Sequence, residues 1–508
     1  MVFSSSAFLL FYCPIMLLVY FACRTRVLRN VWLLVASLLF YSWGEPVYVL
    51  LMVLSIFMNW ALSLAIGGSS KVGVRKALLF IAVVANVLVI GFFKYQGFVA
   101  DNINALAGAE VIGNMNLPLP IGISFYTLQA LSYVIDVYRK QVEPQRNILF
   151  LGMYVACFPQ LIAGPIVRYS TIHEQVLGRK ENLEDFASGL RLFVVGLSKK
   201  VLLANTCAIL ADSMLSQGGS AIGFVGAWGG LIAYTFQIFF DFSGYSDMAI
   251  GLGRMMGFKY LRNFNYPYIS TSVTEFWRRW HISLSTFFRD YIYIPLGGSR
   301  CTTSRHIFNI AVVWTVTGLW HGAAWNYVLW GVYYGVLLIC EKYLWGMRLA
   351  KTPRLVQHVY CIVIYVFGWS FFWITDSTQL VPYWQALVGM YGLTGSASFW
   401  ELGVWEYWVV FAICVAASTP ICPYVKERFL AWVEGRQLVD FLKISVVNPE
   451  RYEADSLCVL EAEPVGKSQA RLLAWANVAV DVLLVMLFLT SLASVISGSF
   501  NPFIYFQF

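Results

Sequence analysis

Apolar residues occur along the chain in long runs rather than at alternating positions. Runs of this kind lie at 7–23, 31–43, 46–66, 77–93, 119–137, 148–166, 189–212, 221–240, 307–340, 357–375, 404–420 and 474–497. A helix needs roughly 20 mostly apolar residues to span a bilayer, and the run at 307–340 is long enough for a second crossing or a re-entrant segment. The pattern predicts an all-α polytopic membrane protein with about 11 to 13 membrane segments.

Two polar stretches interrupt the apolar runs. Basic residues outnumber acidic residues in the stretch 254–305, which predicts a cytoplasmic segment. Its second half mixes aromatic and basic residues at roughly helical spacing, as expected for a helix lying in the membrane interface. Ser272 or Thr274 would cap this helix, and Pro295 would help to end it. The stretch 424–472 has mixed charge and little periodicity, and it is expected to be a cytoplasmic loop or insert.

Composition agrees with a membrane protein. Of the 508 residues, 59% are hydrophobic and 12% are charged, where soluble proteins have roughly 25% charged residues. The net charge of +8 does not require a nucleic-acid partner, because Lys and Arg gather in cytoplasmic loops of membrane proteins. Ten cysteines occur singly, without metal-ligand spacing, so no metal site is expected. The sequence also has no phosphate-binding loop and no dinucleotide fingerprint, so no bound cofactor is expected. One membrane domain over 1–508 is the expected organisation.

Basic loops indicate an orientation. The loops at 24–29, 71–76 and 139–146 fall at alternate turns if the N-terminus lies outside, so we expect these loops in the cytoplasm. The first 23 residues lack a basic region and a small-x-small cleavage site, which favours a retained first span. No internal repeat of fixed period is visible, which weakens a transporter interpretation based on inverted repeats.

One histidine lies in a long stretch that contains no acidic or basic residue besides it. His321 is within a stretch from 307 to 340 without Asp, Glu, Lys or Arg. Such a residue usually faces the bundle interior and marks a site, although a histidine bonded to a backbone carbonyl would also fit. Small residues beside it, Gly318 and Gly322, leave room for a thin ligand. His281, among cations, is either at the mouth of a site or a residue that snorkels to water.

Other polar groups at the ends of apolar runs are candidates for support. Asp241 and Asp247 are costly at a membrane boundary unless they are paired, and the Arg residues of the following basic stretch are the expected partners. Their spacing of six does not place them on one helix face, so a joint acid/base pair is not supported. Gly164-Pro165 breaks a helix next to Gln160 and Arg168, and this segment is expected to line the cavity of His321. The remaining histidines, His173, His306 and His358, are read as ordinary loop or surface residues.

Four motifs together resemble one enzyme family. They are "PQLIAGPIVRY" (159–169), "FDFSGYSDMAIG" (240–251), "YPYISTSVTEFWRRWHISLSTFFRDYIYIPLGGSR" (266–300) and "GLWHGAAW" (318–325). In this order they resemble the membrane-bound O-acyltransferase family, in particular its bacterial branch of alginate and cell-wall O-acetylation proteins.

The resemblance implies a helical fold around a central funnel, with interfacial and re-entrant helices. It implies that His321 is catalytic and that His281 is a second functional position. We expect the funnel or its support to include Trp320, Gly322, Asp241, Ser243, Tyr245, Gln160 and Arg168. The donor would be cytoplasmic acetyl-CoA, whose phosphates cannot enter hydrocarbon and would rest on Arg278, Arg279 and Arg289.

The resemblance also implies an exported or membrane-anchored partner that accepts the acetyl group for a surface polysaccharide, with alginate-like polymers favoured over peptidoglycan. His321 could act as general base or as nucleophile, and the sequence leaves both open. Transfer of D-alanyl groups from a carrier protein to teichoic acid is the nearest alternative. A transporter or flippase is the alternative of another class.

Overall fold

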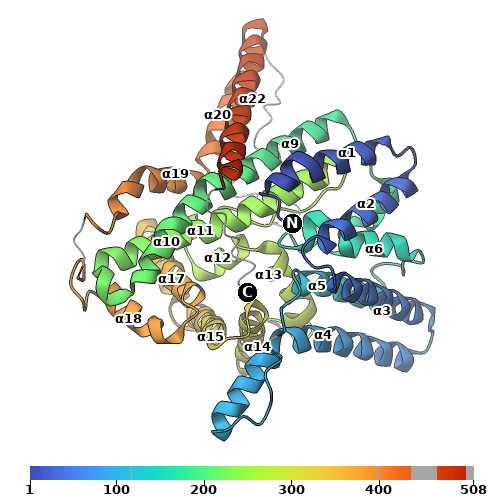
Figure 1. Cartoon of the computed structure of the whole chain (residues 1–508), viewed down its shortest axis with the longest axis horizontal. Coiled ribbons are helices and arrows are strands. Elements are labelled where there is room, and N and C mark those ends of the chain that lie inside the picture. Colours follow the sequence, from blue (N-terminus) through green and yellow to red (C-terminus); the bar gives the residue numbers. More distant parts are fainter. Residues whose placement is uncertain (116, 397–399, 436–465, 499–508) are drawn as a thin grey trace. The chain divides into compact units, whose positions relative to one another are not determined.

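The computed structural model describes residues 1–115, 117–396, 400–435 and 466–498, and it contains no β-strand within these ranges (Figure 1). This confirms the predicted all-α fold. Among the described residues, six helices are long and apolar enough to cross a membrane, or seven if a bent pair counts as one span. The predicted total of 11 to 13 segments also counted shorter runs; those at 119–137 and 148–166 form helices of only 16 and 9 residues.

The chain divides into two compact units. The first comprises Met1–Phe186 and Leu252–Tyr260, and the second comprises Ala187–Gly251 and the residues from Leu261 onward. The prediction of a single membrane domain stays a prediction.

The first unit consists of η1 (Phe8–Tyr12), α1 (Cys13–Ala22), α2 (Arg26–Ser42), α3 (Tyr48–Gly68), α4 (Val72–Ala107), α5 (Ile123–Tyr138), α6 (Ile148–Ala156), α7 (Phe158–Leu161) and α8 (Tyr169–Gly178). Helices α3 and α4 run side by side (Figure 1). Asn59 and Asn86 join them through reciprocal side-chain hydrogen bonds of 2.9 and 3.2 Å. Paired amides of this kind satisfy each other where water is absent.

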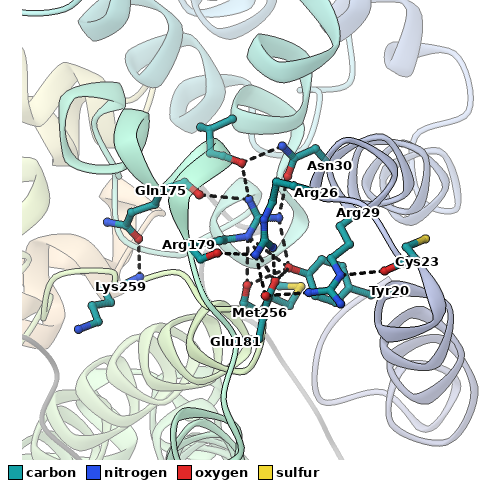
Figure 2. Close-up of polar contacts among 11 residues, drawn as sticks. Tyr20, Cys23, Arg26, Arg29, Asn30, Gln175, Arg179, Glu181, Met256 and Lys259 are labelled. Atoms are coloured by element: carbon teal, nitrogen blue, oxygen red, sulfur yellow. Dashed lines mark hydrogen bonds and ion pairs between the residues drawn. The ribbon is translucent and has the colours of Figure 1, made fainter.

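Figure 2 shows a polar cluster of the first unit that is centred on the guanidinium of Arg179. This group donates to Oδ1 of Asn30 at 2.7 Å, to the carbonyl of Met256 at 3.1 Å and to the hydroxyl of Tyr20 at 3.2 Å. The cluster therefore ties α1, α2 and the segment 252–260 to the loop after α8. Glu181 completes it by pairing with Arg26 and Arg29.

Helices α9 (Leu183–Ser198) and α11 (Gly219–Met255) each have residues in both units. The further elements of the second unit are η2 (Lys199–Ala204), α10 (Asn205–Gln217), η3 (Pro267–Ile269), α12 (Val273–Arg279), α13 (Ile282–Phe288), η4 (Arg289–Tyr293), α14 (Thr303–His321), α15 (Trp325–Cys340), η5 (Glu341–Trp345), α16 (Gly346–Leu349), α17 (Arg354–Trp373), α18 (Ser377–Leu387), η6 (Val404–Tyr407), α19 (Trp408–Ser418), α20 (Ile421–Glu434) and α22 (Lys467–Ile496).

Glycines set the closest helix contacts of the second unit. A Cβ on Gly196 of α9 would lie 2.5 Å from the carbonyl oxygen of Gly244 on α11, and a Cβ on Gly251 would lie 2.5 Å from that of Gly189. Small residues allow backbones in membranes to approach this closely. The two contacts are seven residues apart on both helices, and together they define the register of α9 against α11.

Two sequence expectations are tested in the second unit, and one of them is wrong. The apolar run 307–340 forms two helices, α14 and α15, which lie side by side with a break at 322–324, as the length of the run allowed (Figure 1). The single interfacial helix predicted after Ser272 is wrong: Ser272 does cap α12, but the helix ends at Arg279 because His281 adopts a left-handed conformation.

The predicted polar stretch 424–472 is described only at its two ends. Its first residues continue α20, and 467–472 begin α22. Residues 436–465 lie outside the described residues.

Candidate functional site

A cavity of about 490 Å³ lies within the second unit and brings His281 and His321 to one space. Its other lining residues come from α12, α13, η4, α14 and the end of α15 with η5. They are Thr274, Trp277, Arg278, Trp280, Leu284, Ser285, Phe288, Arg289, Tyr293, Ser299, His306, Ile310, Val313, Trp314, Thr317, Leu338 and Lys342. A volume of this size is typical of small-molecule sites.

His321 is the last residue of α14 and is buried. Its ring lies edge-on to Trp320, Trp330 and Phe372, with centroid distances of 4.8, 5.0 and 4.9 Å. The break after His321 requires a glycine, because a Cβ on Gly322 would lie 2.1 Å from the ring of Tyr327. The ring of His321 is thus held by aromatic side chains at the end of α14. The space that Gly318 and Gly322 were expected to leave for a thin ligand is filled by Tyr327 instead.

His281 is only 2% exposed, so the interpretation as a residue that snorkels to water is wrong. It precedes α13 with φ 44° and ψ 56°, a conformation that L-residues rarely adopt. Its Nδ1 lies 3.2 Å from Oδ1 of Asn263 in a hydrogen bond. Phe242 packs edge-on to the ring at 4.6 Å. Burial lowers the pKa of His281 to about 3, so the ring is neutral at physiological pH.

The basic residues predicted to hold the donor separate into two groups. Arg278 and Arg289 line the cavity and are exposed, and Lys342, which the sequence did not indicate, joins them. Arg279 is buried instead: it pairs with Glu275 at 2.9 Å and donates to the carbonyl of Asn265 at 3.0 Å. The cavity is therefore lined by exposed cations as well as by buried histidines.

The aspartates of α11 pair with lysines of η2 rather than with the following arginines. Asp241 lies 2.8 Å from Lys200, and Asp247 lies 2.7 Å from Lys199. The expected arginine partners were wrong because α9 and η2 pack against α11 and present two adjacent lysines first. Neither aspartate lines the histidine cavity, and Asp247 lines another cavity of the second unit.

Ser243 lies at a different place from the histidines. It lines a second cavity of about 500 Å³ in the second unit, together with Phe264 and Arg262. Phe264 stacks on His281 at a centroid distance of 6.5 Å, so one layer of aromatic rings separates the two cavities. Tyr245 is buried in α11.

Gln160 and Arg168 belong to the first unit. The side chain of Gln160 is buried and donates to the carbonyl of Tyr154 at 2.6 Å. Arg168 precedes α8 as its N-cap residue. Their expected place in the cavity of His321 stays a prediction.

Sequence reasoning missed His306, which also lines the cavity. Tyr293 hydrogen-bonds its Nε2 at 2.7 Å and Tyr343 its Nδ1 at 2.5 Å. Burial, with a contribution from the charge of Lys342, lowers the pKa of His306. The available signal was its position four turns before His321 on one helix, since residues 306 and 321 both fall on the inner face of α14. His173 and His358 hydrogen-bond to backbone carbonyls, those of Ser170 and Ser270.

Comparison with known proteins gives a consistent set of similarities. The family model described as MBOAT, membrane-bound O-acyltransferase family, matches residues 123–381, which include the whole histidine cavity. The chain is 37% identical over 519 residues to the Azotobacter vinelandii protein named "Probable alginate O-acetylase AlgI", covering 100% of both chains.

More distant relatives carry related names. A peptidoglycan O-acetyltransferase of Helicobacter pylori is 34% identical, over 78% of this chain and 80% of its own length. A teichoic acid D-alanyltransferase of Bacillus subtilis is 28% identical, over 50% of this chain and 69% of its own length. All of these names describe transfer of an acyl group.

Proposed function

The chain belongs to the membrane-bound O-acyltransferase family, and from this membership we propose that it passes acetyl groups from cytoplasmic acetyl-CoA towards an exported acceptor. Family membership makes it a multi-pass O-acyltransferase. The acetyl group and an alginate-like polysaccharide are favoured because the relatives named for alginate O-acetylation match the whole chain, whereas a D-alanyltransferase matches half of it.

One observation carries the proposal: three buried histidines, His281, His306 and His321, and three exposed cations line the same cavity. Coenzyme A has a charged nucleotide end and a thin, uncharged pantetheine arm that ends in the thioester. Arg278, Arg289 and Lys342 would hold the phosphates, because such charges cannot leave water unpaired. The arm would then extend into the cavity and bring the thioester to the histidines.

We propose that His321 is the catalytic residue. As a neutral base it takes the proton of the acceptor hydroxyl, whose oxygen attacks the thioester carbon. The carbon–sulfur bond then breaks, and coenzyme A leaves as a thiolate that recovers the proton from the imidazolium. Direct attack by the ring, with an acetyl-imidazole intermediate, is the alternative role for the same residue. Aromatic walls around His321 exclude water and so protect the thioester from hydrolysis.

The acceptor would lie on the opposite face of a bacterial cytoplasmic membrane. We assign the basic loops at 24–29, 71–76 and 139–146 to the cytoplasm and the N-terminus to the periplasm. An exported or membrane-anchored protein would receive the acetyl group there and acetylate the polysaccharide.

The test is acetyl release from radiolabelled acetyl-CoA by the purified protein in nanodiscs, with and without a candidate exported acceptor. We expect His321→Ala to abolish turnover, while His173→Ala, a change at an exposed histidine of the first unit, retains it. Size-exclusion chromatography of each variant controls for folding. Equal turnover by His321→Ala and wild type would remove His321 from the mechanism.

Donors distinguish the alternatives. A D-alanyl-carrier protein in place of acetyl-CoA would be consumed only if the D-alanyltransferase reading were correct. Movement of labelled substrate across vesicles by His321→Ala, without acyl transfer by the wild type, would instead establish a transporter.

A further inference from the structure

Asn263 lies where two segments of the second unit meet beside His281. It is 1% exposed, and its backbone carbonyl accepts the N–H of Ile282 at 2.9 Å. Its side-chain Nδ2 donates to the hydroxyl of Ser246 at 3.1 Å. Its Oδ1 accepts the backbone N–H of Ser283 at 3.1 Å and the hydroxyl of Ser283 at 2.9 Å. Asn263 therefore forms hydrogen bonds to the residues after His281 through both its backbone carbonyl and its side chain.

The contact with Ser283 fixes the orientation of the amide. A backbone N–H can only donate, so the atom of Asn263 that it reaches must be the oxygen. The same oxygen lies 3.2 Å from Nδ1 of His281. Two lone pairs facing each other at that distance would repel, so Nδ1 must carry the hydrogen. In a neutral imidazole the other nitrogen, Nε2, is then the acceptor.

Nε2 of His281 is buried and has no hydrogen-bond partner within the described part of the chain. The residue lines the 490 Å³ cavity, but Nε2 itself has almost no accessible surface, so a donor from that space reaches it only when neighbouring side chains move. Buried polar atoms without a partner are uncommon, and each calls for an explanation such as a catalytic role or a bound water.

We infer that Asn263 is a positioning residue, which holds His281 as the Nδ1–H tautomer so that Nε2 accepts a hydrogen bond from the ligand in the cavity. The inference rests on the proposed function for the identity of that ligand. Two groups of the proposed reaction can donate a hydrogen bond to Nε2: an amide N–H of the pantetheine arm and the O–H of the acceptor. Partners that orient a histidine in this way fix its tautomer and ring plane.

The tautomer is measured directly by solid-state NMR of the full-length protein, labelled with ¹⁵N-histidine, in lipid bilayers. The chain has five histidines, so ten ring nitrogens are observed, and His281→Gln identifies the pair of interest. We expect Nδ1 of His281 to be protonated and Nε2 to appear as an unprotonated nitrogen. A bare Nδ1, or a charged ring at neutral pH, would overturn the inference.

Adding ligands tests whether Nε2 of His281 accepts a hydrogen bond from them. Coenzyme A alone should shift Nε2 if the pantetheine amide is the donor; a shift that requires the acceptor would identify the hydroxyl. No shift of Nε2 with either ligand would refute its role. These spectra need no turnover, so they stand apart from the proposed function: acetyl release by His321→Ala would defeat that function and leave the tautomer untouched.

Variants separate positioning from folding. Asn263→Leu keeps the branched shape of the side chain but removes the acceptor. We expect mixed tautomers of His281 and a fall in kcat/KM of roughly 10–100-fold, as for residues that orient a metal-binding histidine. Asn263→Asp keeps an acceptor oxygen, and Nδ1 should stay protonated. The matched control is Asn86→Leu, which removes another asparagine of 1% exposure. It should lower thermal stability and leave the His281 spectrum unchanged.

Discussion

The ion pair between Lys200 and Asp241 offers a sharp test of how the second unit is stabilised. The two charged groups lie 2.8 Å apart, and their side chains are 3% and 2% exposed. Lys200 also donates to Oδ1 of Asn205 at 2.8 Å. At this separation the Coulomb attraction is about 6 kcal/mol for an effective dielectric constant near 20. Loss of hydration costs several kcal/mol for each ion, so the net value of the pair is small.

Removing one partner has a different effect from removing both. Lys200→Met or Asp241→Leu leaves a buried charge without its counter-ion, and each change should cost about 3–5 kcal/mol of unfolding free energy. The double variant buries two apolar side chains instead, so it should lie near the wild type. The assay is equilibrium unfolding in mixed micelles of dodecyl sulfate and a mild detergent.

The chain contains a control pair outside the apolar runs. Arg254 and Asp185 lie 3.0 Å apart, and their side chains are 23% and 21% exposed. Removing either should cost about 0–1 kcal/mol, because water replaces the lost partner. The reasoning is refuted if the double variant at Lys200 and Asp241 is as unstable as the two single changes summed. It also fails if the single changes cost no more than those of the control pair.

Three further predictions follow from single contacts. Gly322→Ala should reduce acetyl release by displacing the Tyr327 ring, and a compensating Tyr327→Ala should restore part of it; no loss in the single variant would contradict this contact. Glu341→Ala removes a carboxylate that accepts the Thr274 N–H at 2.9 Å and so caps α12. We expect about 0.5–2 kcal/mol of destabilisation, and a higher KM for acetyl-CoA because α12 carries a cation of the cavity. An unchanged KM would argue against a role of this cap in donor binding. Burial opposes ionisation of Glu181, but hydrogen bonds from Arg26 and Tyr20 outweigh it and lower its pKa to about 2 from 4.5. This stabilisation is present above pH 4.5 and is lost as the pH falls towards 2, so acid unfolding curves of wild type and Glu181→Gln should converge in that window.

Much of the fold was predictable from local pattern. Long apolar runs predict membrane helices because the backbone must satisfy its own hydrogen bonds in lipid, and every described element is helical. The same argument singled out His321, since a polar ring inside an apolar run needs a reason to be there. The cap at Ser272 followed from its position before an amphipathic stretch.

Partner choice was not predictable in this way. The sequence suggested arginines for Asp241, but the glycine contacts between α9 and α11 bring Lys200 to it from 41 positions earlier. Arg279 resembled its neighbour Arg278, yet the end of α12 turns it to Glu275 and away from the cavity. Both outcomes depend on which faces the helices present to each other.

The sequence by itself determined the class of protein, its helices and the buried histidine on which the proposed chemistry depends. Hydrophobic periodicity and the cost of burying a polar ring are local properties, so they can be read one segment at a time. Only the tertiary structure decided that His281 and His321 line one cavity, and that Asn263 bonds Nδ1 of His281. Those contacts join segments separated along the chain, and their geometry is set by backbone breaks and close helix packing that no single segment contains.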